Sequence, residues 1–239
     1  MARSAEPGVN ELEATRERRR LQLSSRMGRL RAAHSYRSVL ALVAATFVFA
    51  SVAGDETWTS SVLLLLESVT LFTAVWTSGI ARATSKGLIT LLAASTLTAI
   101  GLLFSDSHKL LGVAGIVTGL LVVATIVTIA VGVVDQEEVN AQSITGAICI
   151  YVLFGLLFVF LYSAVALIGA GDFFAQGTDG TRAVRMYFSY VTLATLGYGD
   201  YTAAGDLGHT LAVLEALMGQ LYLVTVLALL VSRLRGSDA

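Results

Sequence analysis

The sequence predicts an all-α membrane protein with six transmembrane helices and one shorter helix that enters the membrane without crossing it. Three observations support this fold class. Of the 239 residues, 55% are hydrophobic and only 14% are charged. Six apolar runs are each long enough to cross a bilayer, which takes about 20 helical residues. The single proline, Pro7, lies outside all six runs, so none of them contains this helix-breaking residue.

The apolar runs define the elements in order. The predicted spans cover residues 37–53, 60–81, 87–105, 110–134, 145–169 and 207–231. The stretch 170–206 is too polar to cross a membrane, and its pattern predicts a re-entrant helix at 181–193. Irregular backbone at membrane depth is tolerated only where protein or a water-filled cavity surrounds it. The segment that follows residue 193 is therefore expected to line such a cavity.

Basic residues predict the orientation of the spans. With a cytoplasmic amino terminus, thirteen Arg and Lys residues lie inside, and only Lys109, Arg182 and Arg185 lie outside. This asymmetry predicts a multi-pass plasma-membrane protein with both termini in the cytoplasm. A cleavable signal peptide is the alternative for the first run, because Ser51-Val52-Ala53 resembles a cleavage site. The polar leader of nearly forty residues is too long for that alternative.

The segment 1–36 is basic, and two interpretations of it stay open. Asn10 and Glu13 form a capping-box pattern, which favours a helix lying on the inner leaflet. Such a helix would bind anionic lipid headgroups through its basic side chains. The alternative is a solvated tail that only obeys the positive-inside rule. The basic side chains are Arg3, Arg16, Arg18, Arg19, Arg20, Arg26, Arg29 and Arg31.

The most informative motif lies between the last two runs, where residues 191–200 read VTLATLGYGD. Its end, TLGYGD, resembles the T-V-G-Y-G-D selectivity filter of the potassium-channel superfamily, with Leu196 in place of Val. The resemblance implies that K+ is held by carbonyl oxygens, which replace its water shell. Gly197 and Gly199 suit this role, because alternate residues there need glycine-like backbone angles. The implied K+-binding residues are Thr195, Leu196, Gly197 and Tyr198, with Gly199 completing the filter.

An ordinary turn in a soluble protein is the alternative interpretation of Gly-Tyr-Gly-Asp. The position of the motif, after a helix-length segment and before an apolar span, favours the filter. Because one chain then supplies a quarter of a ring, the resemblance implies a homotetramer around a central pore. It implies no cofactor beyond the K+ ions in the filter.

The layout resembles that of six-span tetrameric cation channels. It divides the chain into a four-helix domain at 37–134, a linker at 135–144, a pore domain at 145–231 and a short tail at 232–239. In voltage-gated relatives the fourth helix carries a ladder of arginines. Here the run from Leu110 to Val134 has no charged residue, which predicts a channel without a voltage sensor.

The resemblance also assigns supporting residues. Tyr187 and Phe188 occupy the two aromatic positions of the pore helix, and Tyr187 is expected to hydrogen-bond Asp200. Val191 stands where some members have a supporting glutamate. Gly219 falls at the hinge position of the inner helix, although a glycine that permits close helix contact is the alternative. Gln220 falls at the position that lines the cavity.

Two buried-span carboxyl groups have no counterpart in that pattern. Glu215 lies about 140° around its helix from Gln220, which points it toward the pore helix. We expect it to support the filter through Ser189 or Thr192; the alternative is a carboxylate that reaches solvent. Glu67, in the second span, is either functional or a protonated or hydrogen-bonded carboxyl near the outer interface, partnered by Ser or Thr of a neighbouring helix.

The sequence as a whole predicts a potassium-selective channel that is not voltage-gated. Two alternatives stay open: a non-conducting accessory sensor subunit with a channel fold, and a subunit of a potassium transporter. An enzyme and a nucleic-acid-binding protein are not expected. The sequence has no phosphate loop, metal cluster or nucleophile–base pair that would support either.

Overall fold

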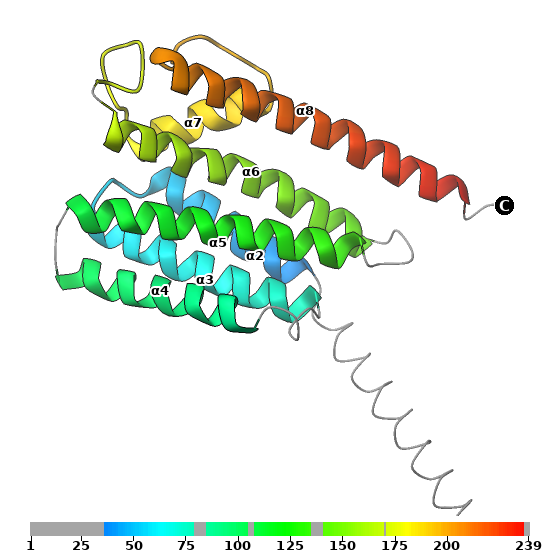
Figure 1. Ribbon diagram of the computed structural model, residues 1–239. Coiled ribbons are helices and arrows are strands. Elements are labelled where there is room, and N and C mark those ends of the chain that lie inside the picture. The colour runs from blue at the N-terminus through cyan, green and yellow to red at the C-terminus, as the bar shows by residue number, and fades with distance from the viewer. Residues whose placement is uncertain (1–35, 79–84, 105–107, 135–140, 170, 237–239) are drawn as a thin grey trace, which may run out of the picture. The chain divides into compact units, whose positions relative to one another are not determined.

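The computed structural model describes residues 36–78, 85–104, 108–134, 141–169 and 171–236 (Figure 1). The basic segment 1–35 and most of the predicted linker lie outside these residues. The described part is all-helical, as predicted, and from Tyr36 onward it packs as one compact unit. Its helices are α2 (Tyr36–Val52), α3 (Thr57–Ser78), α4 (Ser85–Phe104), α5 (His108–Val134), α6 (Ala141–Ile168), α7 (Arg182–Leu193) and α8 (Gly205–Gly236).

Five of these helices are long and apolar enough to cross a membrane: α3, α4, α5, α6 and α8. The helix α2 is apolar but has 17 residues, slightly fewer than a typical span. The predicted bounds agree with the helices to within a few residues at most ends. Two boundaries differ, since α6 already begins at Ala141 and α8 continues to Gly236. The predicted tail at 232–239 therefore starts inside a helix, because Ser-Arg-Leu-Arg continues it before Gly236 ends it.

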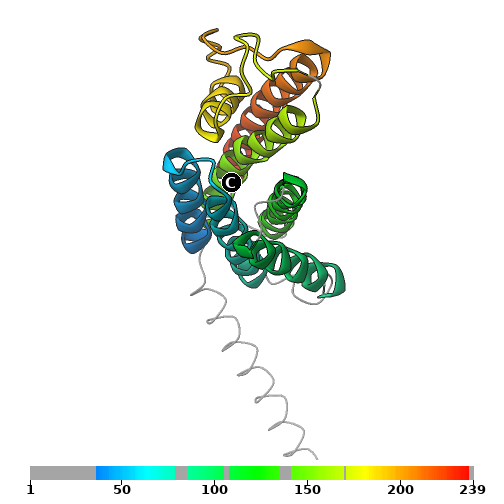
Figure 2. The ribbon, with the colours of Figure 1, turned by 90° about the vertical axis from the view of Figure 1, so that its left-hand side faces the viewer.

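The helix α6 is the centre of the packing. It contacts α2 and α5 on one side and α7 and α8 on the other (Figure 2). The largest apolar core combines side chains of α2, α3, α5, α6 and α7, including Val43, Val122, Leu153 and Met186. Helices of the predicted four-helix domain and of the predicted pore domain thus share one core.

A second set of contacts fixes the short helix α7 and the segment after it. The Tyr190 hydroxyl donates a hydrogen bond to the Val152 carbonyl of α6 at 2.6 Å. The Tyr222 hydroxyl of α8 donates to the Ala147 carbonyl of α6 at 2.7 Å. On the loop side, the Ala204 N–H donates to the Phe173 carbonyl at 2.7 Å. The loop before α7 and the segment before α8 are therefore tied together around α7.

Candidate functional site

The site begins at α7, whose sequence sets both of its ends. Thr181 caps the amino-terminal end, since its hydroxyl accepts a hydrogen bond from the Val184 N–H at 3.3 Å. The chain leaves the helix at Ala194, whose N–H donates to the carbonyls of Thr192 and Tyr190. The helix buries one face, formed by Met186, Phe188, Ser189 and Leu193. The segment with the TLGYGD motif starts directly after this cap.

The backbone of that segment has an alternating conformation. The φ angles of Thr195, Gly197 and Gly199 are 55°, 56° and 81°, so every second residue lies in the left-handed region. A left-handed backbone conformation was predicted for Gly197 and Gly199, because glycine lacks a Cβ atom. It was not predicted for Thr195, a β-branched residue for which a positive φ is strained. Strain of this kind persists only when the surrounding structure holds it.

Two anchors hold the segment. The Val191 carbonyl of α7 accepts hydrogen bonds from the N–H groups of Leu196 at 2.8 Å and of Gly197 at 3.5 Å. The Thr195 N–H donates to the Thr192 carbonyl at 2.9 Å. Val191, whose side chain cannot replace a glutamate, thus contacts the segment through its backbone. A sequence motif does not reveal such a contact, because every residue has a carbonyl.

Gln220 of α8 lies against the first residue of this segment. Its side-chain amide donates a hydrogen bond to the Thr195 hydroxyl at 3.2 Å. Gln220, predicted to line the cavity, and Thr195, predicted to bind K+, are therefore neighbours in one chain. The contact also helps to hold Thr195 in its left-handed conformation.

Tyr187 and Asp200 are also brought together. The Tyr187 hydroxyl donates to the Asp200 carboxylate at 2.8 Å, and its ring stacks on that of Tyr198 with centroids 6.4 Å apart. This hydrogen bond raises the pKa of Tyr187 from its ordinary value near 10 to about 12. The hydroxyl is protonated at physiological pH already at its ordinary pKa, and the raised pKa extends this donor state to higher pH. Its role in support of the segment stays a prediction.

Removing this hydroxyl is the direct test of that role. We expect Tyr187→Phe, which keeps the ring, to cause a severalfold faster loss of ion flux at low external potassium. The physical reason is that Asp200 then loses the donor that links it to α7. Tyr201→Phe is the matched control, because the Tyr201 hydroxyl makes no hydrogen bond to the residues that the structure describes. Identical time courses in the two variants would refute a supporting role for Tyr187.

Phe188, the second aromatic position, faces away from the segment. It is buried among Tyr162, Phe173 and Phe174, with ring centroids 5.2 to 6.1 Å from its own. It packs α7 onto α6 and onto the loop before α7.

Glu215 is fully buried between three helices, so the solvent-reaching alternative is wrong. Its carboxyl oxygens lie 2.5 Å from the hydroxyls of Ser189 on α7 and Tyr162 on α6. Ser189 was among the predicted partners, and Tyr162 was missed. Tyr162 lies four residues after Phe158, on the same face of α6. This shared face is the only signal in the sequence that places Tyr162 near α7.

The number of hydrogens available to the groups around Glu215 indicates whether its carboxyl group is protonated. The Ser189 hydroxyl lies within hydrogen-bond distance of the Gly155 carbonyl, at 2.8 Å, as well as of Glu215. A hydroxyl has one hydrogen, so it cannot serve two acceptors fully. If Glu215 is neutral, all of these contacts can be hydrogen bonds at once. Its carboxyl O–H donates to the Ser189 hydroxyl, and its carbonyl oxygen accepts from the Tyr162 hydroxyl. The Ser189 hydroxyl is then free to donate to the Gly155 carbonyl.

Gly219 has a packing reason in the structure. A Cβ atom there would lie 2.4 Å from the Leu193 carbonyl oxygen at the end of α7. The close-contact alternative is therefore present in the fold, while the hinge role stays a prediction.

Glu67 of α3 is also fully buried, and neither carboxyl oxygen has a hydrogen-bond partner among the described residues. Within the same residues, no group of His, Cys, Asp or Glu side chains is suited to a metal ion.

Comparisons with known proteins agree with this geometry. The family model described as "Ion channel" matches residues 147–236, which include α7, the TLGYGD segment and α8. A stretch of 70 residues is 37% identical to an inward rectifier potassium channel of Paramagnetospirillum magnetotacticum. The predicted resemblance to the potassium-channel superfamily is confirmed. The matched stretch covers 29% of this chain and 24% of the relative, so the chain spans about a quarter of that channel. No solved structure matches the chain significantly.

The match and the apolar helices together make this a multi-pass membrane protein. The matched residues cover the predicted pore domain. The helices α2, α3, α4 and α5 lie outside the residues that the family model matches.

Proposed function

We propose that this chain is one subunit of a homotetrameric, potassium-selective channel that conducts K+ passively across the plasma membrane. The observation that carries the proposal is the alternation of left-handed residues at Thr195, Gly197 and Gly199, anchored on Val191. Such an alternation suits carbonyl groups that line one side of a strand and replace the water shell of K+. The proposed ligands are the carbonyls of Thr195, Leu196, Gly197 and Tyr198. The similarity to a protein named as a potassium channel supports this ion.

The exposure of side chains in the TLGYGD segment supports the assembly of several copies of this chain. In the single chain, the side chains of Leu196 and Tyr198 are 57% and 67% exposed, although both residues belong to the proposed filter. Only 11% of the apolar window of α8 is buried. Four copies around one axis would cover these side chains and complete the ring of carbonyls. We propose in addition that the chain divides into a four-helix domain and a pore domain. In this proposal α2 crosses the membrane as a sixth span.

We also propose that both termini are cytoplasmic and that the arginines of segment 1–36 bind anionic lipid. The channel needs no cofactor besides the permeating ion. The ion-channel match favours a protein without enzymatic activity.

Potassium flux into liposomes tests the proposal directly. Purified protein should carry K+ down its gradient, with reversal potentials that follow potassium and barely respond to sodium. The absence of flux from a well-folded tetramer would favour the accessory-subunit alternative. Flux that depends on a second ion gradient would favour the transporter alternative.

The response to voltage is a separate prediction. Conductance in symmetrical potassium should change only gradually with voltage, because α5 has no charged residue from Leu110 to Val134. Each charge that crosses the field contributes about 2.3 kcal/mol per 100 mV, and the stretch from Leu110 to Val134 supplies none. Planar-bilayer recordings from −100 to +100 mV, roughly the range in which gating charges respond, measure the slope. An effective gating charge of several units per tetramer would contradict the prediction.

A further inference from the structure

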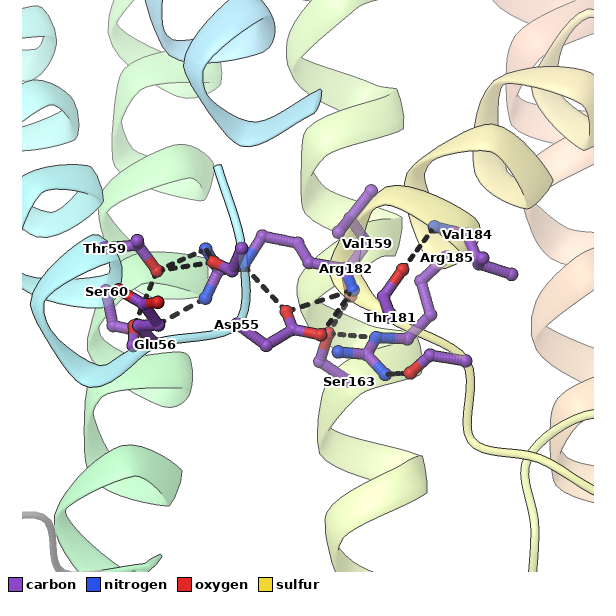
Figure 3. Close-up of polar contacts among 12 residues, drawn as sticks. Asp55, Glu56, Thr59, Ser60, Val159, Ser163, Thr181, Arg182, Val184 and Arg185 are labelled. Carbon is purple, nitrogen blue, oxygen red and sulfur yellow. Dashed lines mark hydrogen bonds and ion pairs between the residues drawn. The ribbon is translucent and has the colours of Figure 1, made fainter. Parts of the chain in front are cut away.

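The loop between α2 and α3 is bonded to the amino-terminal end of α7 (Figure 3). Both carboxylate oxygens of Asp55, in this loop, accept the Arg182 N–H at 3.1 Å. Arg182 is the first residue of α7, and its N–H is one of those left without a partner inside the helix. The carboxylate also places a negative charge at the positive end of the helix dipole. Asp55 thus supplements the Thr181 cap from a distant part of the chain.

The Arg182 side chain makes a second set of bonds to the same region. Its guanidinium donates to the hydroxyls of Thr59 at 3.0 Å and Ser60 at 3.1 Å, and to the Gly54 carbonyl at 3.4 Å. The side chain is only 12% exposed, and its Nε lies 3.9 Å from Asp55. Burial lowers the pKa of this guanidinium from its ordinary value, and the Asp55 carboxylate offsets part of that effect. A buried cation with this many partners fixes the two segments against each other.

The contact continues along the flank of α7. The Ser51 hydroxyl of α2 lies 3.3 Å from the Met186 sulfur and 2.8 Å from the Phe47 carbonyl oxygen of its own helix. One turn further along α7, the Tyr190 ring meets the Phe47 ring of α2 edge-on, with centroids 4.9 Å apart. The helix α7 is therefore held on one flank by α2, by the loop that follows α2 and by the start of α3, from its first residue almost to the start of the TLGYGD segment.

Arg185, one turn away from Arg182, provides a contrast. Its guanidinium donates to the Ser163 hydroxyl of α6 and to the carbonyls of Asp179 and Gly180 in the loop before α7 (Figure 3). These partners all belong to the predicted pore domain. Of the two arginines, only Arg182 is bonded to the region between α2 and α3.

We propose that the loop between α2 and α3 positions α7 within its own chain, and that Asp55 and Arg182 are positioning residues for the filter. The inference rests on the proposed function and gives the four-helix domain a role that does not depend on gating charges. The four-helix domain would act as a brace at the outer end of α7. Loosening that end would let the carbonyl of Val191, at the other end, move away from the filter backbone.

A double-mutant cycle tests this coupling in the full-length tetramer. We expect Asp55→Asn and Arg182→Gln each to accelerate the loss of potassium flux at low external potassium by about two- to fivefold. The double variant should lose less than the product of the two single effects, because the two side chains share the ion pair at 3.9 Å, although each also loses bonds of its own. Asp55→Asn combined with Arg185→Gln should come closer to multiplied effects, since Arg185 makes none of its hydrogen bonds to Asp55 and is coupled to it only through charge. Equal melting temperatures of the tetramers would separate positioning from global stability.

Hydrogen exchange provides a readout that does not require ion flux. Asp55→Ala should speed amide exchange at the start of α7, around Arg182, and leave the middle of α6 unchanged. If wild-type protein conducts no potassium, the proposed function fails, and the exchange result still decides the coupling. Unchanged exchange together with unchanged flux decay, or multiplied effects in the Asp55 and Arg182 double variant, would overturn the inference.

Discussion

Replacing Gly197 with alanine should abolish potassium-selective flux. The φ angle of Gly197 is 56°, a conformation that L residues rarely adopt. Forcing alanine into it costs on the order of 1–3 kcal/mol per chain, and the proposed tetramer would bear this cost four times in one ring. Within its own chain the space around Gly197 is open, so the cost that one chain contributes comes from the backbone conformation. Liposome flux with potassium and sodium gradients measures the loss.

Gly205→Ala is the matched control for this substitution. Gly205 also has a positive φ, of 74°, and open space at the Cβ position, but it lies at the start of α8. We expect a similar loss of stability per chain without a change of ion selectivity. If Gly197→Ala conducts selectively at a normal rate, the assignment of the filter is wrong.

Glu215→Leu should destabilise the tetramer or the conducting state of the filter. The substitution leaves the buried Tyr162 hydroxyl without its acceptor, which costs about 1–3 kcal/mol per chain. Glu215→Gln should preserve both stability and flux, because the amide can donate to Ser189 and accept from Tyr162 as a neutral carboxyl would. The melting temperature of the tetramer and the rate of potassium flux are the measurements.

A double variant separates the lost hydrogen bond from the change of shape. Tyr162→Phe combined with Glu215→Leu removes both partners, so no buried hydroxyl is left unpaired at this position. We expect it to recover part of the stability that Glu215→Leu loses. Equal, near-normal flux and melting temperatures in the Leu and Gln variants would leave Glu215 without a supporting role.

Local sequence patterns sufficed for much of the architecture. The apolar runs predicted the helices because a segment that crosses lipid must satisfy its own backbone and present apolar side chains. The TLGYGD motif predicted the similarity to potassium channels, since few other residues permit closely spaced carbonyl ligands. The pairing of Tyr187 with Asp200 was implied by the same resemblance. These features depend on residues that are close together in the chain or fixed within one motif.

Contacts between distant helices were decided only by the tertiary structure. The left-handed Thr195 could not be predicted from a preference that favours glycine there. Tyr162 reaches Glu215, and Asp55 reaches Arg182, across 53 and 127 positions of the sequence. Hydrophobic periodicity shows which face of a helix is buried, but it does not show which neighbour meets that face. The sequence alone determined an apolar, helical chain with a channel-like motif, and the packing of α2 and α6 on α7 determined what holds that motif in place.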